Sequence, residues 1–162
     1  MALSPGDTAP DVTLFDSDMQ PFSLSDVRTD GPVVLLFFPG AFTSVCTTEL
    51  STVANDYARY SNSGATVVGI STDSPFALAE FKRVNSFPFR LLSDHEGAVA
   101  AAYGAKYDHD FTPMKYDRIA RRAAFVVGTD GRLAYAEVLE SAGDQPDFEA
   151  IVATLGKLGT EV

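Results

Sequence analysis

The sequence predicts an α/β fold in which helices cover a central mixed sheet and a β-hairpin precedes it. Short apolar runs alternate with segments whose apolar residues recur at helical spacing, which is typical of strand–helix–strand units. A second hairpin and a closing amphipathic helix follow this alternation. With 162 residues, 46% of them hydrophobic, the chain is long enough for a substantial core, and we expect one domain over residues 1–162.

The first half of the chain is expected to form a hairpin, a helical turn and two buried strands with a helix between them. In chain order these elements cover residues 11–15 with 21–24, 25–27, 33–38, 43–61 and 65–71. The hairpin turns at Asp16-Ser17-Asp18, since such residues favour turns. Residues 33–38 are apolar almost throughout, which indicates a strand covered on both faces. Asn62-Ser63-Gly64 is expected to end the helix, because glycine suits the residue after a helix.

The second half is expected to contain a helix, a short strand, a small helix, a polar loop, a hairpin and a final helix. In chain order these elements cover residues 75–85, 89–92, 96–103, 105–117, 122–127 with 132–139, and a helix that starts at Pro146-Asp147. Ser74 is an N-cap followed by proline at the first helical position. Phe81 and Val84 belong to the apolar face of that helix. Thr129-Asp130-Gly131 is the turn of the second hairpin.

The composition excludes several classes of protein. Twenty-two acidic residues against 12 basic ones give a net charge of −10, and no basic stripe exists, so nucleic-acid binding is not expected. No stretch reaches membrane-spanning length and the N-terminus lacks a signal peptide, so we expect a cytoplasmic protein without membrane contact. The acidic, lysine-poor composition suits either an ordinary acidic protein or one from a high-salt cytoplasm.

Cys46 is the one cysteine of the chain and stands where the buried strand turns into a helix. A side chain at the start of a helix meets unpaired N–H groups and the positive end of the helix dipole. Both favour the thiolate, which is the reactive form. Ligands in sheets of this kind bind beyond the carboxyl ends of strands, where Cys46 is expected to lie. The sequence therefore predicts a reactive cysteine, and the lack of a second cysteine for an internal disulfide fits a reducing compartment.

The residues around Cys46 strengthen this prediction. Thr43 is the expected N-cap, and Cys46 takes the third position after it, where a capping box has Glu or Gln. The Thr43 hydroxyl can donate a hydrogen bond to sulfur or to an oxygen beside it. Pro39 and Phe42 can shield the site, and Glu49, one turn on, can hold a nearby arginine. The alternative is a buried cysteine that only fills space, which is common for free cysteine.

Neither a metal nor a cofactor is expected. His95 and His109 lie near Asp94, Asp108 and Asp110, but these residues lack the spacing of a metal site, and we expect a polar surface loop. Met114 and Tyr116 of the same loop can form a pocket wall, an interface or ordinary packing.

The run Pro39-x-x-x-Thr43-x-x-Cys46, followed by Glu49, resembles the active-site run of the peroxiredoxin family. Further similar segments are Gly6-Asp7-x-Ala9-Pro10-Asp11, Leu91-Leu92-Ser93-Asp94, Arg122-x-x-Phe125 and Asp130-Gly131, so the resemblance spans nearly the full chain. It implies a thioredoxin-like sandwich and reduction of hydrogen peroxide or organic hydroperoxides by a thiol. The chain is most similar to short one-cysteine members, of either the alkyl hydroperoxide reductase E type or the bacterioferritin-comigratory type.

The resemblance also implies roles for individual residues. Cys46 would be the nucleophile, Thr43 would hydrogen-bond the peroxide and Pro39 would shield the thiolate. Arg122 would stabilise the thiolate and the developing charge, and Glu49 would orient the arginine. Because Arg121 and Arg122 are adjacent on a strand they point to opposite faces, and the spacing to Phe125 favours Arg122.

One departure from the family matters for the reaction cycle. Some members carry a second cysteine five positions after the first, where this chain has Ser51. The sulfenic acid would therefore need an external thiol, from a thioredoxin-like protein, a glutaredoxin-like protein or a small molecule. The resemblance further implies a homodimer or a higher homo-oligomer.

Two functions other than a peroxidase are compatible with a reactive cysteine on this fold. A thiol–disulfide oxidoreductase would normally need Cys-x-x-Cys, but position 49 is Glu. A redox sensor or thiol-based binding module would oxidise slowly at Cys46 and change a partner contact. The rate of reaction with peroxide distinguishes a peroxidase from a redox sensor or binding module, because a peroxidase cysteine should react far faster than a free thiol.

Overall fold

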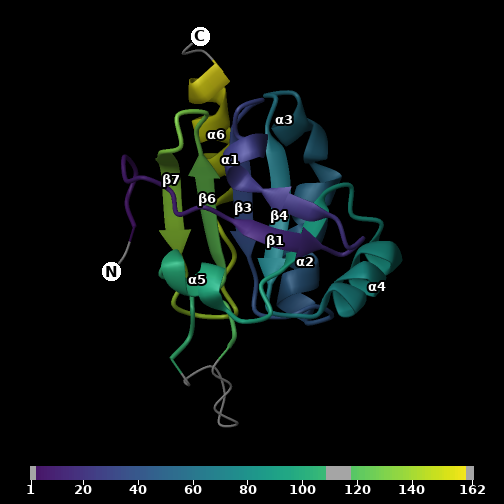
Figure 1. The fold of residues 1–162 in the computed structure, drawn as a ribbon. Coiled ribbons are helices and arrows are strands. Elements are labelled where there is room, and N and C mark those ends of the chain that lie inside the picture. The colour runs from purple at the N-terminus through teal and green to yellow at the C-terminus, as the bar shows by residue number, and fades with distance from the viewer. Residues whose placement is uncertain (1–2, 109–117, 160–162) are drawn as a thin grey trace.

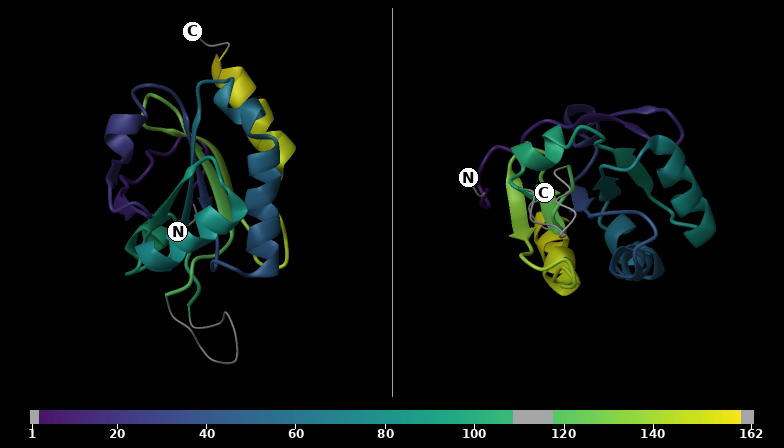
Figure 2. Two further views of the ribbon diagram at one scale, coloured as in Figure 1. Left: turned by 90° about the vertical axis from the view of Figure 1, so that its right-hand side faces the viewer. Right: turned by 90° about the horizontal axis from the view of Figure 1, so that it is seen from below.

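Residues 3–108 and 118–159 are described by a computed structural model, in which helices pack on both faces of a mixed sheet (Figures 1 and 2). The sheet has seven strands in the order β2-β1-β5-β4-β3-β6-β7. The strands are β1 (Thr13–Asp16), β2 (Pro21–Ser23), β3 (Val33–Phe37), β4 (Thr66–Ser71), β5 (Arg90–Ser93), β6 (Ala123–Val127) and β7 (Leu133–Val138). Strands β3, β4 and β5 run parallel, and the remaining pairs are antiparallel.

The helices form two layers. They are α1 (Leu24–Val27), α2 (Ser44–Asn55), α3 (Tyr57–Ser61), α4 (Pro75–Asn85), α5 (Ala98–Ala102) and α6 (Phe148–Gly159). Side chains of α2, α3, α4 and α6 pack on one face of the sheet, whereas those of α1 and α5 pack on the other. The view from below shows α6, α2 and α4 side by side along one face (Figure 2, right).

The buried strand β3 explains why the sheet needs two helical layers. Alternate side chains of a strand point to opposite faces. Val34 and Leu36 belong to the core under α2 and α6, while Val33, Leu35 and Phe37 belong to the core under α5. All five are fully buried, as the apolar run predicted.

The predicted fold class is confirmed, and three details of the prediction are wrong. The helix expected to reach Ser61 is interrupted at Asp56, which joins α2 to α3; aspartate is a poor helix former because its side chain competes for backbone groups. The helix expected from Glu96 begins only at Ala98, after the left-handed Gly97. Val84 was placed on the apolar face of α4 but is 55% exposed.

The pairing of β3 with β6 determines where the candidate site lies. These strands are antiparallel, and Phe37 at the carboxyl end of β3 pairs with Ala123 at the start of β6. The residues that follow β3 therefore meet those that precede β6.

Within the described part of the chain, no helix has the length and apolar character required to cross a membrane.

Candidate active site

Cys46 lies in the first turn of α2, immediately beyond the carboxyl end of β3. Thr43 is the N-cap of this helix, so the cysteine occupies the third helical position, as expected. The side chain is fully buried and belongs to the core that α2 shares with α4 and α6. Burial at a helix N-terminus keeps the sulfur away from bulk water and near the backbone N–H groups of the first turn.

Arg122 brings a guanidinium group to this sulfur. Its Nη2 atom donates to Cys46 Sγ at 3.3 Å and to the carbonyl oxygen of Ala142 at 3.0 Å. Its Nη1 atom donates to Glu49 Oε1 at 2.6 Å. These three partners fix the guanidinium group. Because Arg122 is only 1% exposed, solvent screens its charge very little.

The neighbouring Arg121 points elsewhere. Its guanidinium lies over the ring of Tyr107, 4.5 Å from the centroid, and Nη1 donates to the carbonyl oxygen of Glu140 at 3.5 Å. Arg121 and Arg122 both precede β6, which begins at Ala123, and their side chains contact different partners. Of this pair, Arg122 is the one whose guanidinium contacts Cys46.

Glu49 and Arg122 form a buried ion pair with unequal partners. Burial raises the pKa of Glu49 to about 7, and the attraction of Arg122 only partly opposes that rise. Burial lowers the pKa of Arg122, but the Glu49 and Cys46 anions outweigh this and raise it, so the guanidinium stays charged. Within the described residues, Glu49 Oε2 and Arg122 Nε have no hydrogen-bond partner. The buried carboxyl group of Glu49 and the sulfur of Cys46 therefore share one guanidinium group.

Thr43 has the expected position but not the expected hydrogen bond. Its hydroxyl donates to the carbonyl oxygen of Gly40 at 3.0 Å, and it makes no side-chain cap to the first turn of α2. Thr43 is thus the N-cap by position, as predicted, while its hydroxyl in this state contacts neither the first-turn N–H groups nor the sulfur. The consequence is that the first-turn N–H groups near Cys46 are not covered by this side chain, while the hydroxyl oxygen can still accept a hydrogen bond.

A pocket of about 200 Å³ opens above the sulfur. It is lined by Pro39, Thr43, Ser44, Val45, Cys46, Arg122, Ala142 and Gly143. Pro39 is buried and Thr43 is exposed, so the proline lies at the inner wall and the threonine near the mouth. The four site residues predicted around Cys46 thus gather there: Pro39 and Thr43 line the pocket with Arg122, and Glu49 lies behind the arginine.

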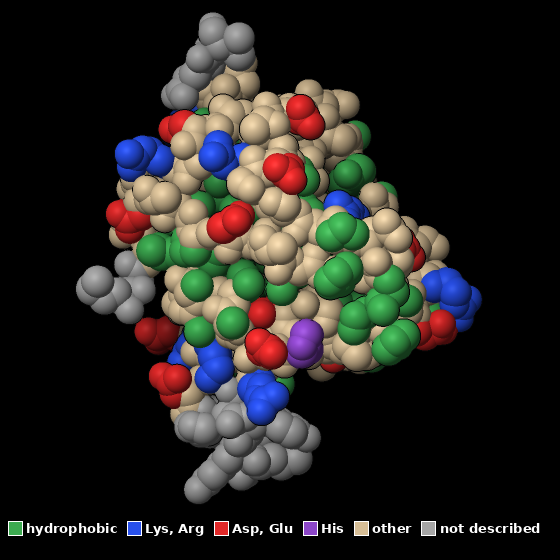
Figure 3. Space-filling view, in the orientation of Figure 1, with side chains coloured by type: hydrophobic (Ala, Val, Ile, Leu, Met, Phe, Trp, Pro, Cys, Tyr) green, Lys and Arg blue, Asp and Glu red, His purple; other side chains and the backbone are tan. Residues whose placement is uncertain are grey.

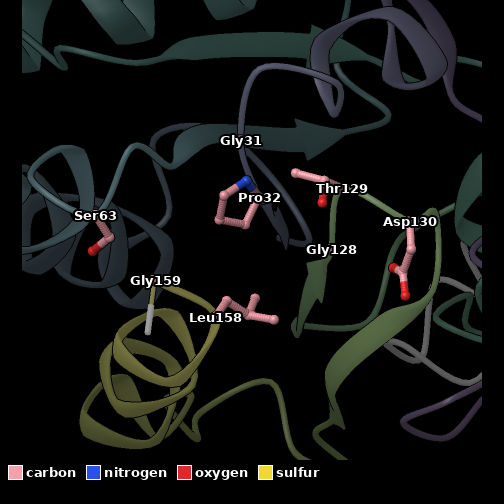
Figure 4. A pocket seen from close by; sticks show the side chains of 8 residues that line it. All are labelled: Gly31, Pro32, Ser63, Gly128, Thr129, Asp130, Leu158 and Gly159. Atoms are coloured by element: carbon pink, nitrogen blue, oxygen red, sulfur yellow. The ribbon is translucent and has the colours of Figure 1, made fainter. Parts of the chain in front are cut away.

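A larger pocket, of about 440 Å³, lies at the other end of the β3–β6 pair (Figure 4). Gly31, Pro32, Leu158 and the Gly128–Asp130 turn are among its lining residues. It contains no cysteine and no cation, so size alone would misplace the active site. We assign the site by its chemistry, because a nucleophile with a contacting guanidinium is found in the smaller pocket.

Several residues of the site region carried no recognised signal in the sequence. Ala142 contributes a backbone carbonyl, which any residue could supply. Gln145 donates from Nε2 to the carbonyl oxygen of Val45 at 3.1 Å and so ties the segment after β7 to the first turn of α2. Asp73 Oδ2 accepts a hydrogen bond from Ala41 N at 2.8 Å.

Of the polar residues near His95, Asp94 has a structural role, and some others lie outside the described residues. Asp94 was expected on a surface loop but is 2% exposed, and it accepts hydrogen bonds from the N–H groups of Val99 and Ala100 at the start of α5. Among the described residues, no three His, Cys, Asp or Glu side chains gather as a metal site would require. His109, Asp110, Met114 and Tyr116 lie outside the described residues.

Comparisons with known proteins identify the family of this chain. The sequence model of the AhpC/TSA family matches residues 5–136. A putative peroxiredoxin of Mycobacterium tuberculosis is 36% identical over 135 residues, which cover 83% of this chain and 85% of that protein. The peroxiredoxin Bcp of Escherichia coli K12 is 32% identical over 133 residues, covering 82% and 84%.

The crystal structure of peroxidoxin BcpB from M. tuberculosis superposes with a TM-score of 0.84, at 34% identity, over 96% of this chain and 97% of that one. A peroxiredoxin-like protein from Aquifex aeolicus gives 0.86 at 24% identity, over 98% and 89%, which supports the thioredoxin-like fold. The relatives and the single cysteine favour the bacterioferritin-comigratory alternative among the two subgroups. The chain belongs to the AhpC/TSA family and is a one-cysteine, Bcp-like peroxiredoxin.

Proposed function

We propose that Cys46 is the peroxidatic nucleophile of this thiol-dependent peroxidase, in one thioredoxin-like domain over residues 1–162. The observation that carries the proposal is the 3.3 Å hydrogen bond from Arg122 to Cys46 Sγ at the base of a pocket. A buried cation in contact with sulfur stabilises the thiolate, and the thiolate is the form that attacks peroxide.

In the proposed oxidation step, the thiolate attacks one oxygen of the peroxide. A bond forms between Sγ and that oxygen while the O–O bond breaks, which leaves Cys46 as a sulfenic acid. Water or an alcohol is released after the leaving oxygen takes a proton from solvent. Negative charge moves from sulfur to the leaving oxygen, so donors fixed along this path stabilise the transition state more than the ground state.

Each of the predicted residues has a place in this step. Arg122 is oriented by Glu49 and by the Ala142 carbonyl, and its guanidinium stabilises charge on sulfur and on the peroxide. The oxygen of Thr43, whose hydrogen is directed to Gly40, accepts from the O–H of the peroxide at the mouth of the pocket. Pro39 keeps water from the sulfur at the inner wall.

The cycle is completed by an external thiol, because the chain has one cysteine. A thiolate attacks the sulfur of the sulfenic acid, expels hydroxide and forms a mixed disulfide. A second thiol then attacks the mixed disulfide, which regenerates the Cys46 thiolate and releases a disulfide product. Thioredoxin-like proteins, glutaredoxin-like proteins and small thiols are the reductants to compare.

We also propose that the protein forms a homo-oligomer and is located in the cytoplasm. Phe15, Phe42 and Phe76 are between 55% and 73% exposed, and hydrophobic side chains gather near the edge of the molecule formed by α4 (Figure 3). Exposed aromatic side chains of this size support a contact between copies. Light scattering at several protein concentrations tests the oligomer.

The proposed chemistry is tested by rapid mixing of reduced protein with hydrogen peroxide and with an alkyl hydroperoxide, followed by mass analysis. We expect rapid gain of one oxygen at Cys46 that persists until thiol is added, and no gain in Cys46→Ser. Arg122→Ala and Thr43→Val should be oxidised at least about 100-fold more slowly while remaining folded. Oxidation of wild type no faster than that of a free thiol would favour the redox sensor, and equal rates for Arg122→Ala and wild type would remove the arginine from the mechanism.

A further inference from the structure

A carboxylate outside the catalytic cluster holds the loop between β3 and α2. Asp73 lies two residues after β4, and its Oδ2 atom accepts hydrogen bonds from Ala41 N at 2.8 Å and from Ser71 Oγ at 2.6 Å. Ala41 is two residues after Pro39 and two before Thr43. The bond therefore lies midway between two residues that line the Cys46 pocket.

The loop that Asp73 holds contains a strained residue. Phe42 follows Ala41 and has a φ of 67°, in the left-handed region that side chains other than glycine rarely adopt. Its ring packs against Phe81 of α4, with 5.1 Å between centroids, yet it remains 55% exposed. A left-handed conformation of this kind persists only where its surroundings impose it. Three contacts restrain this part of the loop: Ala41 N donates to Asp73, the Phe42 ring packs on Phe81, and the Thr43 hydroxyl donates to Gly40.

The anchor is itself fixed by regular structure. Ser71 is fully buried in β4, and its hydroxyl also accepts from Asp73 N at 3.2 Å. Ser93 of β5, 2% exposed, donates to the carbonyl oxygen of Asp73 at 2.7 Å. Ser74, the next residue, is the N-cap of α4 and accepts from Ala77 N. The backbone of Asp73 is thus fixed by β5 and by the start of α4, and its carboxylate links β4 to the loop in front of Cys46. Groups built on rigid elements hold a site more accurately than loops do.

We propose that Asp73 is a positioning residue for the oxidation of Cys46. Through the N–H of Ala41 it holds Phe42 in the left-handed conformation, and this keeps Thr43 and Pro39 in register with the sulfur. The inference rests on the proposed function, in which Cys46 attacks a peroxide beside Thr43. Because Asp73 acts on the peroxide-facing loop and does not contact the sulfur, its loss should impair reaction with peroxide far more than reaction with a simple alkylating reagent.

The test compares two rate constants for Cys46 in each variant, one with hydrogen peroxide and one with iodoacetamide. For Asp73→Ala we expect peroxide oxidation to fall about 10- to 100-fold, because small misplacements of reacting groups cost that much, while alkylation changes by less than about threefold. Both hydrogen bonds from Ala41 and Ser71 end on Oδ2, so the carbonyl oxygen of Asp73→Asn can accept them. That variant should keep its oxidation rate within about threefold of wild type.

Ser74→Ala is the matched control. It removes the N-cap of α4 beside Asp73 and should destabilise the protein without slowing oxidation. If Asp73→Ala does not fold, Ser71→Ala carries the test: it keeps the carboxylate, removes one of its supports, and should slow oxidation about three- to tenfold with alkylation unchanged.

The outcomes separate the two proposals. If Asp73→Ala, or Ser71→Ala in its place, is oxidised as fast as the control Ser74→Ala, the positioning role of Asp73 is overturned. A fall in the alkylation rate that matches the fall in the oxidation rate would overturn it as well. Wild-type protein that reacts with peroxide at a site other than Cys46 would instead overturn the proposed function. Slow peroxide oxidation with normal alkylation, restored by Asp73→Asn, supports the positioning role.

Discussion

The buried carboxyl of Glu49 predicts a specific dependence of stability on pH. Glu49 is fully buried, one oxygen accepts from Arg122 and the other has no partner among the described residues. Burial raises its pKa from an ordinary value of 4.5 to about 7. Between these two values the folded protein keeps a proton that the unfolded chain releases.

The sign and size of the effect follow from linkage. A group whose pKa is higher in the folded state stabilises the fold in full below its unfolded pKa, and this contribution is lost as pH rises through the folded pKa. For a pKa of 4.5 raised to about 7, the loss amounts to about 3 kcal/mol, at about 1.4 kcal/mol per pH unit. Glu49→Gln removes the titration, and its amide oxygen can still accept from Arg122.

The assay is urea unfolding of wild type and Glu49→Gln at intervals from pH 4 to pH 8. We expect wild type to lose about 3 kcal/mol relative to the variant between about pH 4.5 and 7.5, with unchanged m values. The exposed Glu96 gives the matched control Glu96→Gln, whose profile should parallel wild type. Parallel profiles for wild type and Glu49→Gln would show that Glu49 has the same pKa in the folded and the unfolded state, and would refute the argument from burial.

Three further substitutions test the site and the packing. Arg122→Lys keeps the charge but cannot reach Glu49, Cys46 and the Ala142 carbonyl with one planar group, so stopped-flow oxidation should slow about 100-fold, while Arg121→Lys should react as wild type does. A Cβ atom on Gly31 would stand 2.2 Å from the backbone oxygen of Gly64, so Gly31→Ala should lower the free energy of unfolding by about 2 kcal/mol or more in urea; an unchanged value would mean that this loop shifts freely. In α6, a Cβ atom on Gly156 would meet nothing within 4 Å, so Gly156→Ala should raise the free energy of unfolding by about 0.5–1 kcal/mol and with it the melting temperature. A lower melting temperature would contradict the helical assignment.

Local patterns in the chain were sufficient for much of the site. The spacing of Thr43, Cys46 and Glu49 within one helix start specifies their relative positions, because a helix has a fixed rise and turn. The apolar run before them predicted the strand that delivers the cysteine to the edge of the sheet. The spacing to Phe125 favoured Arg122 over Arg121, and the contact with Cys46 Sγ agrees with that choice, although both arginines precede β6.

Other features depended on interactions that leave no pattern in the sequence. The sequence predicted that the Thr43 hydroxyl could donate to sulfur, but only the path of the loop showed that it donates to the carbonyl oxygen of Gly40. The carbonyl of Ala142 belongs to the backbone, so its contact with Arg122 has no residue signature. Asp73 reads as an ordinary residue before a helix until the fold brings it to Ala41, 32 positions earlier in the chain.

The order of residues therefore specified the strands, the helix start and the nucleophile, since these depend on periodicity and on neighbours within a few positions. The folded chain alone decided which carbonyl, carboxylate and guanidinium meet at the sulfur. These contacts join segments separated by up to 76 positions, between Cys46 and Arg122, and they exist only once the β3–β6 pairing has closed that distance. Burial of Glu49 at this junction, rather than its identity, is what moves its pKa.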